Sequence, residues 1–339
     1  MKTKPMTKFA ILALSLVLVA CAGGGSEEAG CPAIDGREIN VVATTPMIGE
    51  FVSQVGGENI NLTVLMPPEA NPHTYEPAPQ DAGTIAEADL VFYTGLLYEP
   101  AALVKLLENS ACSTDILSEV GESVFPIEFK EGGHDDHDDH DDEEGHDDHD
   151  DEEGHDDHEG HNHGAYDPHF WFDPSRVAYA AEYIESRLIQ FDPENESSYI
   201  SSADSFVSEL NDLTKQVSEL ISTVPSQNRK LITTHESFGY LEAKFGLEVL
   251  STIIPSLNSA NEISPSDLAG VIDVIEDNNV KVIFIESEAP SVYSETIVAE
   301  TGIKPVTGLY VETLKPGQSY SEFLISNVTL ITENLQDTD

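Results

Sequence analysis

Short apolar, β-branched runs alternate with amphipathic stretches along most of this chain. The runs that predict strands are 39–44, 61–66 and 88–94 in the first half, and 230–234, 247–253 and 280–285 in the second half. Helical patterns separate them, as at 48–55, 238–245, 265–277 and 292–301. Strands alternating with helices are typical of parallel sheets covered by helices. We therefore expect an α/β protein of two lobes, 39–190 and 226–339, each with a parallel sheet flanked by helices.

The strongest helical pattern lies between the two predicted lobes. Apolar residues recur at alternating spacings of four and three from Tyr199 to Val224, after Asp192 as a cap and Pro193 at the first helical position. A helix of about 30 residues is about 45 Å long. Residues 191–225 are therefore predicted to form one long helix that joins the lobes.

The first 20 residues have the pattern of an export signal. Three lysines precede an apolar run that is too short to span a bilayer, and the run ends in Leu-Val-Ala before Cys21. This ending resembles the lipobox of bacterial lipoproteins, in which the cysteine is lipidated; an ordinary signal peptide is the alternative. Residues 21–38 would then be the lipidated cysteine and a flexible tether. We expect an extracytoplasmic protein, periplasmic or on the outer face of the cell, held to a membrane by its lipid anchor.

Composition and charge narrow the classes of function. With 40% apolar and 23% charged residues, the chain of 339 residues can bury a globular core. Its 63 acidic and 15 basic side chains give a formal net charge of −48. Such a surface repels phosphate backbones, so no nucleic-acid partner is expected.

Two cysteines remain once Cys21 is assigned to lipidation. Cys31 and Cys112 form an even pair in a chain expected in an oxidising compartment, which favours a disulfide between them; free thiols are the alternative. Neither cysteine belongs to a Cys-x-x-Cys pair or lies beside a histidine. Zinc ligation by thiolates is therefore not expected.

A low-complexity insertion at 131–165 is predicted to be disordered without a ligand. Its central part, 134–163, holds 17 acidic residues and nine of the twelve histidines, repeats HDDHDDEEG, and has no apolar residue to form a core. Regularly spaced imidazoles among carboxylates indicate binding of borderline divalent cations, whereas a purely solvating segment would need no histidine. The accessory metal-binding residues expected here are His134, His137, His140, His146, His149, His155, His158, His161 and His163.

Only three histidines lie outside the insertion, and each occurs where a strand pattern ends or a loop begins. His73 lies in NPHTYEP after the strand predicted at 61–66, His169 lies in DPHFWFDP before a helical pattern at 175–190, and His235 follows KLITT. In open parallel α/β sheets, ligands bind beyond the C-terminal ends of the strands. One such histidine alone is more often structural, but three together predict a metal site.

The segments NPHTYEP, DPHFWFDP and TTHESFGY resemble the three histidine motifs of the zinc- and manganese-binding solute proteins of bacterial ABC importers, the cluster A-I or metal-binding-lipoprotein family. The resemblance covers about residues 39–335, including the long helix and an acidic, His-rich insertion typical of zinc members. It implies that His73, His169 and His235 bind the metal ion in a cleft between the lobes. It also implies a monomeric solute-binding lipoprotein, not an enzyme, that delivers Zn²⁺ to an ABC permease and its ATPase in the cytoplasmic membrane.

The resemblance places the fourth ligand in the segment IFIESE, and Glu286 is the preferred candidate. Glu288, two residues further along an extended chain, and water are the alternatives. Three imidazole nitrogens and a carboxylate favour Zn²⁺ over Mn²⁺, which prefers oxygen ligands. Nearby carboxylates that would orient the imidazoles, or would only cap helices or face solvent, are Glu76, Asp167 and Asp173.

Three other readings compete with a zinc-capturing importer component. A manganese-binding member of the same family would share the fold and most ligands. A surface metal buffer or adhesin would explain the insertion and the lipid, but would not need two lobes with convergent histidines. A secreted zinc hydrolase would need a signature such as His-Glu-x-x-His, which the sequence lacks.

Overall fold

The computed structural model describes residues 31, 34, 36–68, 70–129, 166–288 and 292–336. Cys21, the export signal and all nine histidines of the insertion lie outside the described residues, so the predictions made for them stay predictions. All described residues belong to one compact unit, Cys31–Asp339. Among the described helices, none is both long enough and apolar enough to cross a membrane.

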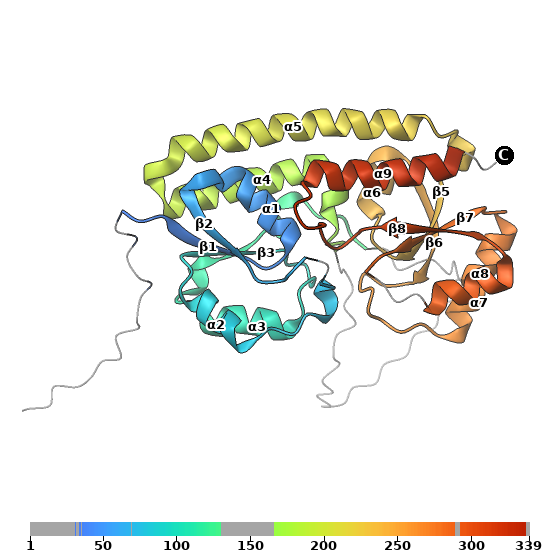
Figure 1. The fold of residues 1–339 in the computed structure, drawn as a ribbon, viewed down its shortest axis with the longest axis horizontal. Helices are drawn as coiled ribbons and strands as arrows, with labels where there is room; N and C mark the ends of the chain where they lie inside the picture. The colour runs from blue at the N-terminus through green and yellow to red at the C-terminus, as the bar shows by residue number, and fades with distance from the viewer. Residues whose placement is uncertain are drawn as a thin grey trace, which may run out of the picture. The chain divides into compact units, whose positions relative to one another are not determined.

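The first lobe is built on a parallel sheet, as predicted, with a fourth strand that the sequence did not indicate. Its strand order is β2 (Ile60–Val64), β1 (Ile39–Ala43), β3 (Leu90–Tyr93) and β4 (Leu117–Glu119). Alternate residues of β1 face opposite sides, so Val41 packs into the core that contains α1 (Pro46–Gly56) and α4 (Pro174–Phe191). Val42 packs on the other side with residues of α2 (Pro79–Ala86) and α3 (Ala101–Ser110). Figure 1 shows these two helices on the face of the sheet opposite α1 and α4.

The second lobe contains two pairs of parallel strands. β5 (Lys230–His235) pairs with β6 (Glu248–Ile254), and β7 (Val282–Glu286) pairs with β8 (Lys304–Leu309). The pairs adjoin where β5 and β7 end, because the amide of Glu286 donates to Oγ1 of Thr234 at 3.0 Å. The helices of this lobe are α6 (Gly239–Phe245), α7 (Pro265–Asp277), α8 (Val292–Thr301) and α9 (Tyr320–Gln336).

One long helix, α5 (Glu196–Ser222), packs against α4 of the first lobe and α9 of the second (Figure 1). Its 27 residues bury the predicted apolar face, from Tyr199 to Ile221. The helix begins three residues later than predicted because Pro193–Asn195 form a separate 3-10 turn. Asp192 does not cap α5; its carboxylate accepts hydrogen bonds from the side chains of Tyr199 and Asn195.

A disulfide joins Cys31 to Cys112, which confirms the predicted pairing. Cys31 precedes β1, and Cys112 follows the end of α3. The bond therefore ties the start of the described chain to the outer helical layer of the first lobe. Because it closes a loop across 81 positions of sequence, it restricts the unfolded chain over a long segment.

Candidate metal centre

His73 lies in a short 3-10 turn, Pro72–Thr74, which follows β2. Pro72 fixes the backbone at the start of the turn, and the Asn71 side chain accepts a hydrogen bond from the His73 amide at 2.9 Å. The imidazole packs edge-on against the ring of Tyr98, with 5.0 Å between ring centroids. Local turn chemistry thus directs the first predicted ligand inward, and its side chain is only 3% exposed.

His169 is fixed by the carboxylate of Asp167 and by buried aromatic residues. Oδ1 of Asp167 lies 2.8 Å from both the backbone nitrogen and Nδ1 of His169. The next three residues, Phe170–Phe172, form a fully buried 3-10 turn, and within it Trp171 Nε1 donates to the carbonyl of Val311 in the second lobe. The imidazole itself is completely buried. Of the three nearby carboxylates considered from sequence, Asp167 orients an imidazole, Asp173 caps α4, and Glu76 is exposed.

His235 is the last residue of β5 and is held by Glu286, the last residue of β7. Nδ1 of His235 lies 2.5 Å from Oε2 of Glu286, and the His235 amide donates to Oε1 of the same carboxylate at 3.2 Å. Both side chains are buried. This is the predicted location, at the C-terminal ends of adjoining parallel strands.

The three histidines converge with Glu312, the third residue after β8. One ligand atom from each of His73, His169, His235 and Glu312 lies within 4.8 Å of the others. Oε1 of Glu312 lies 3.1 Å from Nε2 of His73 and 3.0 Å from Nε2 of His235, while Oε2 lies 3.6 Å from Nε2 of His169. The Tyr98 hydroxyl donates to Oε2 at 2.8 Å and orients the carboxylate. His73 and His169 come from the first lobe and His235 and Glu312 from the second, so the site lies between the lobes.

The placement of Glu286 among the converging ligand atoms was wrong, because Glu312 occupies that position. Glu286 lies on the Nδ1 side of His235, away from the shared point where the Nε2 atoms meet. Glu288 is not in the group either: its Oε1 accepts hydrogen bonds from the amides of Val311 and Glu312, and so supports the loop that carries Glu312. Sequence reasoning missed Glu312 because β8, KPVTGL, has only two buried residues and no clear strand pattern.

The buried imidazoles and carboxylates of the site shift one another's pKa values. Burial lowers the pKa of His235, but the charge of Glu286 and hydrogen bonds to Glu286 and Glu312 outweigh it and raise the pKa well above its ordinary value. Burial also lowers the pKa of His169, but the contacts with Asp167 and Glu312 outweigh burial and raise this pKa. Burial raises the pKa of Glu312, but the charge of His73 and contacts with His169 and His235 bring it well below the ordinary range. A cation that enters here therefore competes with protons.

The arrangement provides four donor groups, the number that a closed zinc site uses. In His169 and His235, a carboxylate occupies Nδ1, which leaves Nε2 as the free donor and fixes the tautomer. Three imidazole nitrogens and one carboxylate oxygen are ligands that Zn²⁺ accepts at about 2.0–2.2 Å. The four described side chains thus supply a donor set that suits a divalent cation.

Known proteins with the same fold bind metals. The fold matches that of a periplasmic zinc-binding protein, TroA, from Treponema pallidum, with a TM-score of 0.72, 21% identity, and coverage of 88% of this chain and 99% of that one. It also matches Fe(III)-bound YtgA from Chlamydia trachomatis, with a TM-score of 0.72, 25% identity, and coverage of 88% and 98%. These likenesses confirm the predicted α/β fold with parallel sheets flanked by helices.

Two relatives that match over nearly the full length are named as manganese lipoproteins. The manganese-binding lipoprotein MntA of Halalkalibacterium halodurans is 22% identical, covering 96% of this chain and 97% of its own. The manganese ABC transporter substrate-binding lipoprotein PsaA of Streptococcus anginosus is 26% identical, covering 98% and 99%. A family model described as "Zinc-uptake complex component A periplasmic" matches residues 41–334. The chain therefore belongs to this family of metal-binding substrate-binding components of ABC transporters.

Proposed function

We propose that the protein captures Zn²⁺ between its two lobes and delivers it to an ABC permease, which its ATPase drives, for high-affinity zinc uptake. The observation that carries this proposal is the convergence of His73, His169, His235 and Glu312 on one buried point. A carrier needs to bind its cargo ion without reacting with it. A closed set of four protein ligands suits that task, since an open coordination position is the mark of catalytic zinc.

The donor set supports zinc as the cargo. Mn²⁺ lies at the weak end of the divalent series and prefers carboxylate, carbonyl and water oxygens, whereas imidazole suits Zn²⁺. Here three of four donors are imidazole nitrogens. Manganese is the second candidate, because the relatives MntA and PsaA are named as manganese proteins. The family description, in contrast, names zinc.

Competition between the two ions tests this choice. We expect the purified protein to take up one equivalent of Zn²⁺ tightly, and an equimolar mixture of Zn²⁺ and Mn²⁺ to leave zinc in the site, because nitrogen donors stabilise Zn²⁺ more. Elemental analysis after gel filtration measures the occupant. The His169→Ala variant is the control for binding elsewhere on the chain. Retention of manganese from the mixture would overturn the zinc assignment and establish the manganese alternative.

The proposal extends to two parts of the chain outside the described residues. Lipidation of Cys21 would hold the monomeric protein at the extracytoplasmic face of the cell membrane, close to the permease. The nine insertion histidines, listed above, would bind further Zn²⁺ weakly and raise its local concentration near the site, an effective-concentration effect. In this proposal the insertion is an accessory to the centre at His73, His169, His235 and Glu312.

Deleting residues 131–165 tests the accessory role. We expect the deletion to abolish several weak zinc sites and to leave one tight site, because none of the four converging ligands belongs to the insertion. The backbones on either side already meet in a bridge between Glu128 and Tyr166, so a short Gly-Ser link can close the gap. Isothermal titration calorimetry of both forms gives the number of sites. A deletion protein that binds no stoichiometric zinc would contradict the accessory assignment.

The deletion and a Glu312 variant, tested in cells, separate the competing classes of function. A metal buffer on the cell surface would lose most of its relevant capacity with the insertion, and cells that carry the deletion would grow in zinc-depleted medium like cells that lack the protein. An importer component should retain growth that depends on Glu312. A function as an adhesin would persist in the Glu312→Ala variant, since adhesion does not need the metal centre.

A further inference from the structure

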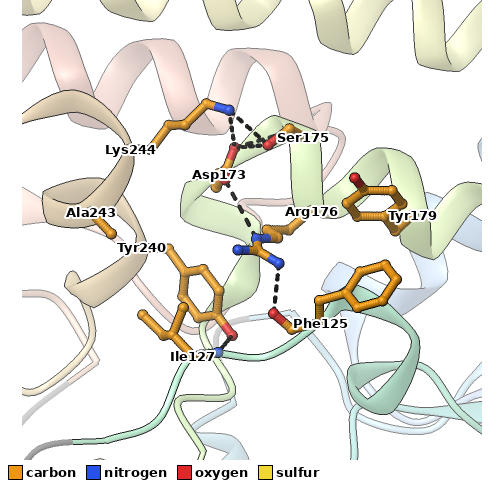
Figure 2. Close-up of a pocket in the computed structure, with 9 residues that line it drawn as sticks. All are labelled: Phe125, Ile127, Asp173, Ser175, Arg176, Tyr179, Tyr240, Ala243 and Lys244. Atoms are coloured by element: carbon orange, nitrogen blue, oxygen red, sulfur yellow. Dashed lines mark hydrogen bonds and ion pairs between the residues drawn. The ribbon is translucent and has the colours of Figure 1, made fainter.

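A cavity of about 450 Å³ lies between α4 and α6 and is lined in part by Ile127 and Tyr240. Figure 2 shows these two residues, with the Tyr240 hydroxyl directed at the Ile127 backbone. Ile127 precedes the insertion, and Asp167 follows it. Through Tyr240 and Ile127 the cavity adjoins the backbone on the two sides of the insertion, Ile127 before it and Asp167 after it.

The Tyr240 hydroxyl ties these two chain ends together. It donates to the carbonyl of Asp167 at 2.8 Å and accepts a hydrogen bond from the amide of Ile127 at 3.2 Å. The amide of Asp167 in turn donates to the Ile127 carbonyl at 3.0 Å. Two of these hydrogen bonds hold the backbone of Asp167 directly, two residues before the histidine that the Asp167 side chain orients, and the third ties Ile127 to Tyr240.

Gly239, the residue before Tyr240, lies against the side chain of Asp167. A Cβ added at Gly239 would lie 2.7 Å from Oδ2 of Asp167, while the other oxygen, Oδ1, contacts Nδ1 of His169 at 2.8 Å. A side chain at Gly239 would therefore push the carboxylate that pairs with the imidazole. The displaced atom is the end of a flexible side chain, so the fold can accommodate the change although the contact with His169 cannot.

We propose that Gly239 and Tyr240 are positioning residues for His169, acting through Asp167. They begin α6, four and five residues after His235, so one segment of the second lobe supplies a ligand and also orients a ligand of the first lobe. Tyr240 fixes the backbone of Asp167, and the bare face of Gly239 leaves room for its carboxylate. With Asp167 in place, Nδ1 of His169 is engaged and Nε2 is directed at the metal. The inference rests on the proposed function, because it concerns how tightly the same site holds Zn²⁺.

Two substitutions test the two contacts, each with a matched control. Gly239→Ala introduces the clash with Asp167, and Gly270→Ala in α7 is its control, since a Cβ there meets no atom within 4 Å. Tyr240→Phe removes the hydroxyl, and Tyr199→Phe is its control, since that buried hydroxyl binds Asp192 far from the ligands in sequence. All four variants are made in the full-length chain, and circular dichroism and thermal unfolding report whether each folds.

The first readout is the Nδ1 proton of His169 in metal-free protein, observed by NMR after ¹⁵N-histidine labelling. We expect two protected Nδ1 protons in the wild type, from His169 with Asp167 and from His235 with Glu286. Gly239→Ala should lose or shift the His169 signal and keep that of His235. Tyr240→Phe should speed the exchange of the His169 Nδ1 proton with water. A role confined to packing would leave this signal unchanged, and that result in both folded variants would overturn the proposal.

The second readout is zinc affinity by competition with a chelator, with zinc below one equivalent so that the tightest site fills first. Loss of an orienting partner weakens metal binding about 10–100-fold, so we expect a loss in this range for Gly239→Ala and a smaller one for Tyr240→Phe. In an Asp167→Ala background, Gly239→Ala should have no further effect, since both act through the same carboxylate. Additive losses would overturn the proposal. A wild-type protein that binds no zinc would instead refute the proposed function, while the NMR readout would still decide the positioning role.

Discussion

Replacing Glu312 by glutamine should weaken zinc binding about a thousandfold, or about 4 kcal/mol. The change keeps the size of the side chain but removes the negative charge that the buried site directs at the cation, and it offers an amide oxygen as a much poorer ligand. Because Glu312 contacts all three imidazoles and Tyr98, no other described carboxylate can take its place without the chain moving. Chelator competition on the purified variant measures the loss.

Glu286→Gln and Glu219→Gln provide the comparisons. Glu286 orients His235 without joining the converging ligand atoms, so its loss should cost about 10–100-fold. Glu219 is exposed on α5 and should change nothing. The order of effects therefore distinguishes a ligand from a residue that orients a ligand. A larger loss for Glu286→Gln than for Glu312→Gln would restore the assignment first made from sequence.

The fold was predictable where burial imposes a clear period on the sequence. Strands β1, β3, β5 and β7 are short runs with at least three buried residues each, and α5 has a regular apolar stripe, so their patterns are unambiguous. β4 has three residues of which one is buried, and β8 is mostly exposed, so neither produces a period that sequence can reveal. Pro193 misled the helix start, because it opens a 3-10 turn as readily as an α-helix.

The site was predictable as far as its ligands follow recognisable chain features. The three histidines lie beside prolines or at a strand end, and the structure brings all three together. To choose the carboxylate that joins the three histidines, one has to know which side of the His235 ring each candidate faces. Glu286 is the last residue of β7 and Glu312 follows β8, but the side of the His235 ring that each one meets depends on how β7 and β8 are placed beside β5. Gly239 gave no chemical signal at all, since its contribution is space for the Asp167 carboxylate.

Zinc affinity should fall steeply as the pH decreases, by up to about a thousandfold per pH unit where all three imidazoles are protonated in the metal-free protein. The decline should begin above the ordinary imidazole value of about 6.5, because the pKa values of His169 and His235 are raised. Calorimetry or chelator competition from about pH 8 to about pH 5.5 measures it. Measuring the variant without residues 131–165 excludes zinc binding by the insertion histidines from the result.

The raised and lowered pKa values also determine how the stability of the metal-free and the zinc-bound protein depends on pH. Raised histidine pKa values stabilise the metal-free fold below about pH 6.5, and this contribution is lost as the pH rises through the raised values. The lowered pKa of Glu312 stabilises it above about pH 4.5, a contribution lost only as the pH falls through that lowered value. The affinity for zinc, in contrast, increases with pH as the histidines lose their protons. The increase in Tm on adding saturating zinc should therefore be small near pH 5.5 and should grow towards pH 8, and a constant increase across this range would rule out a three-histidine site.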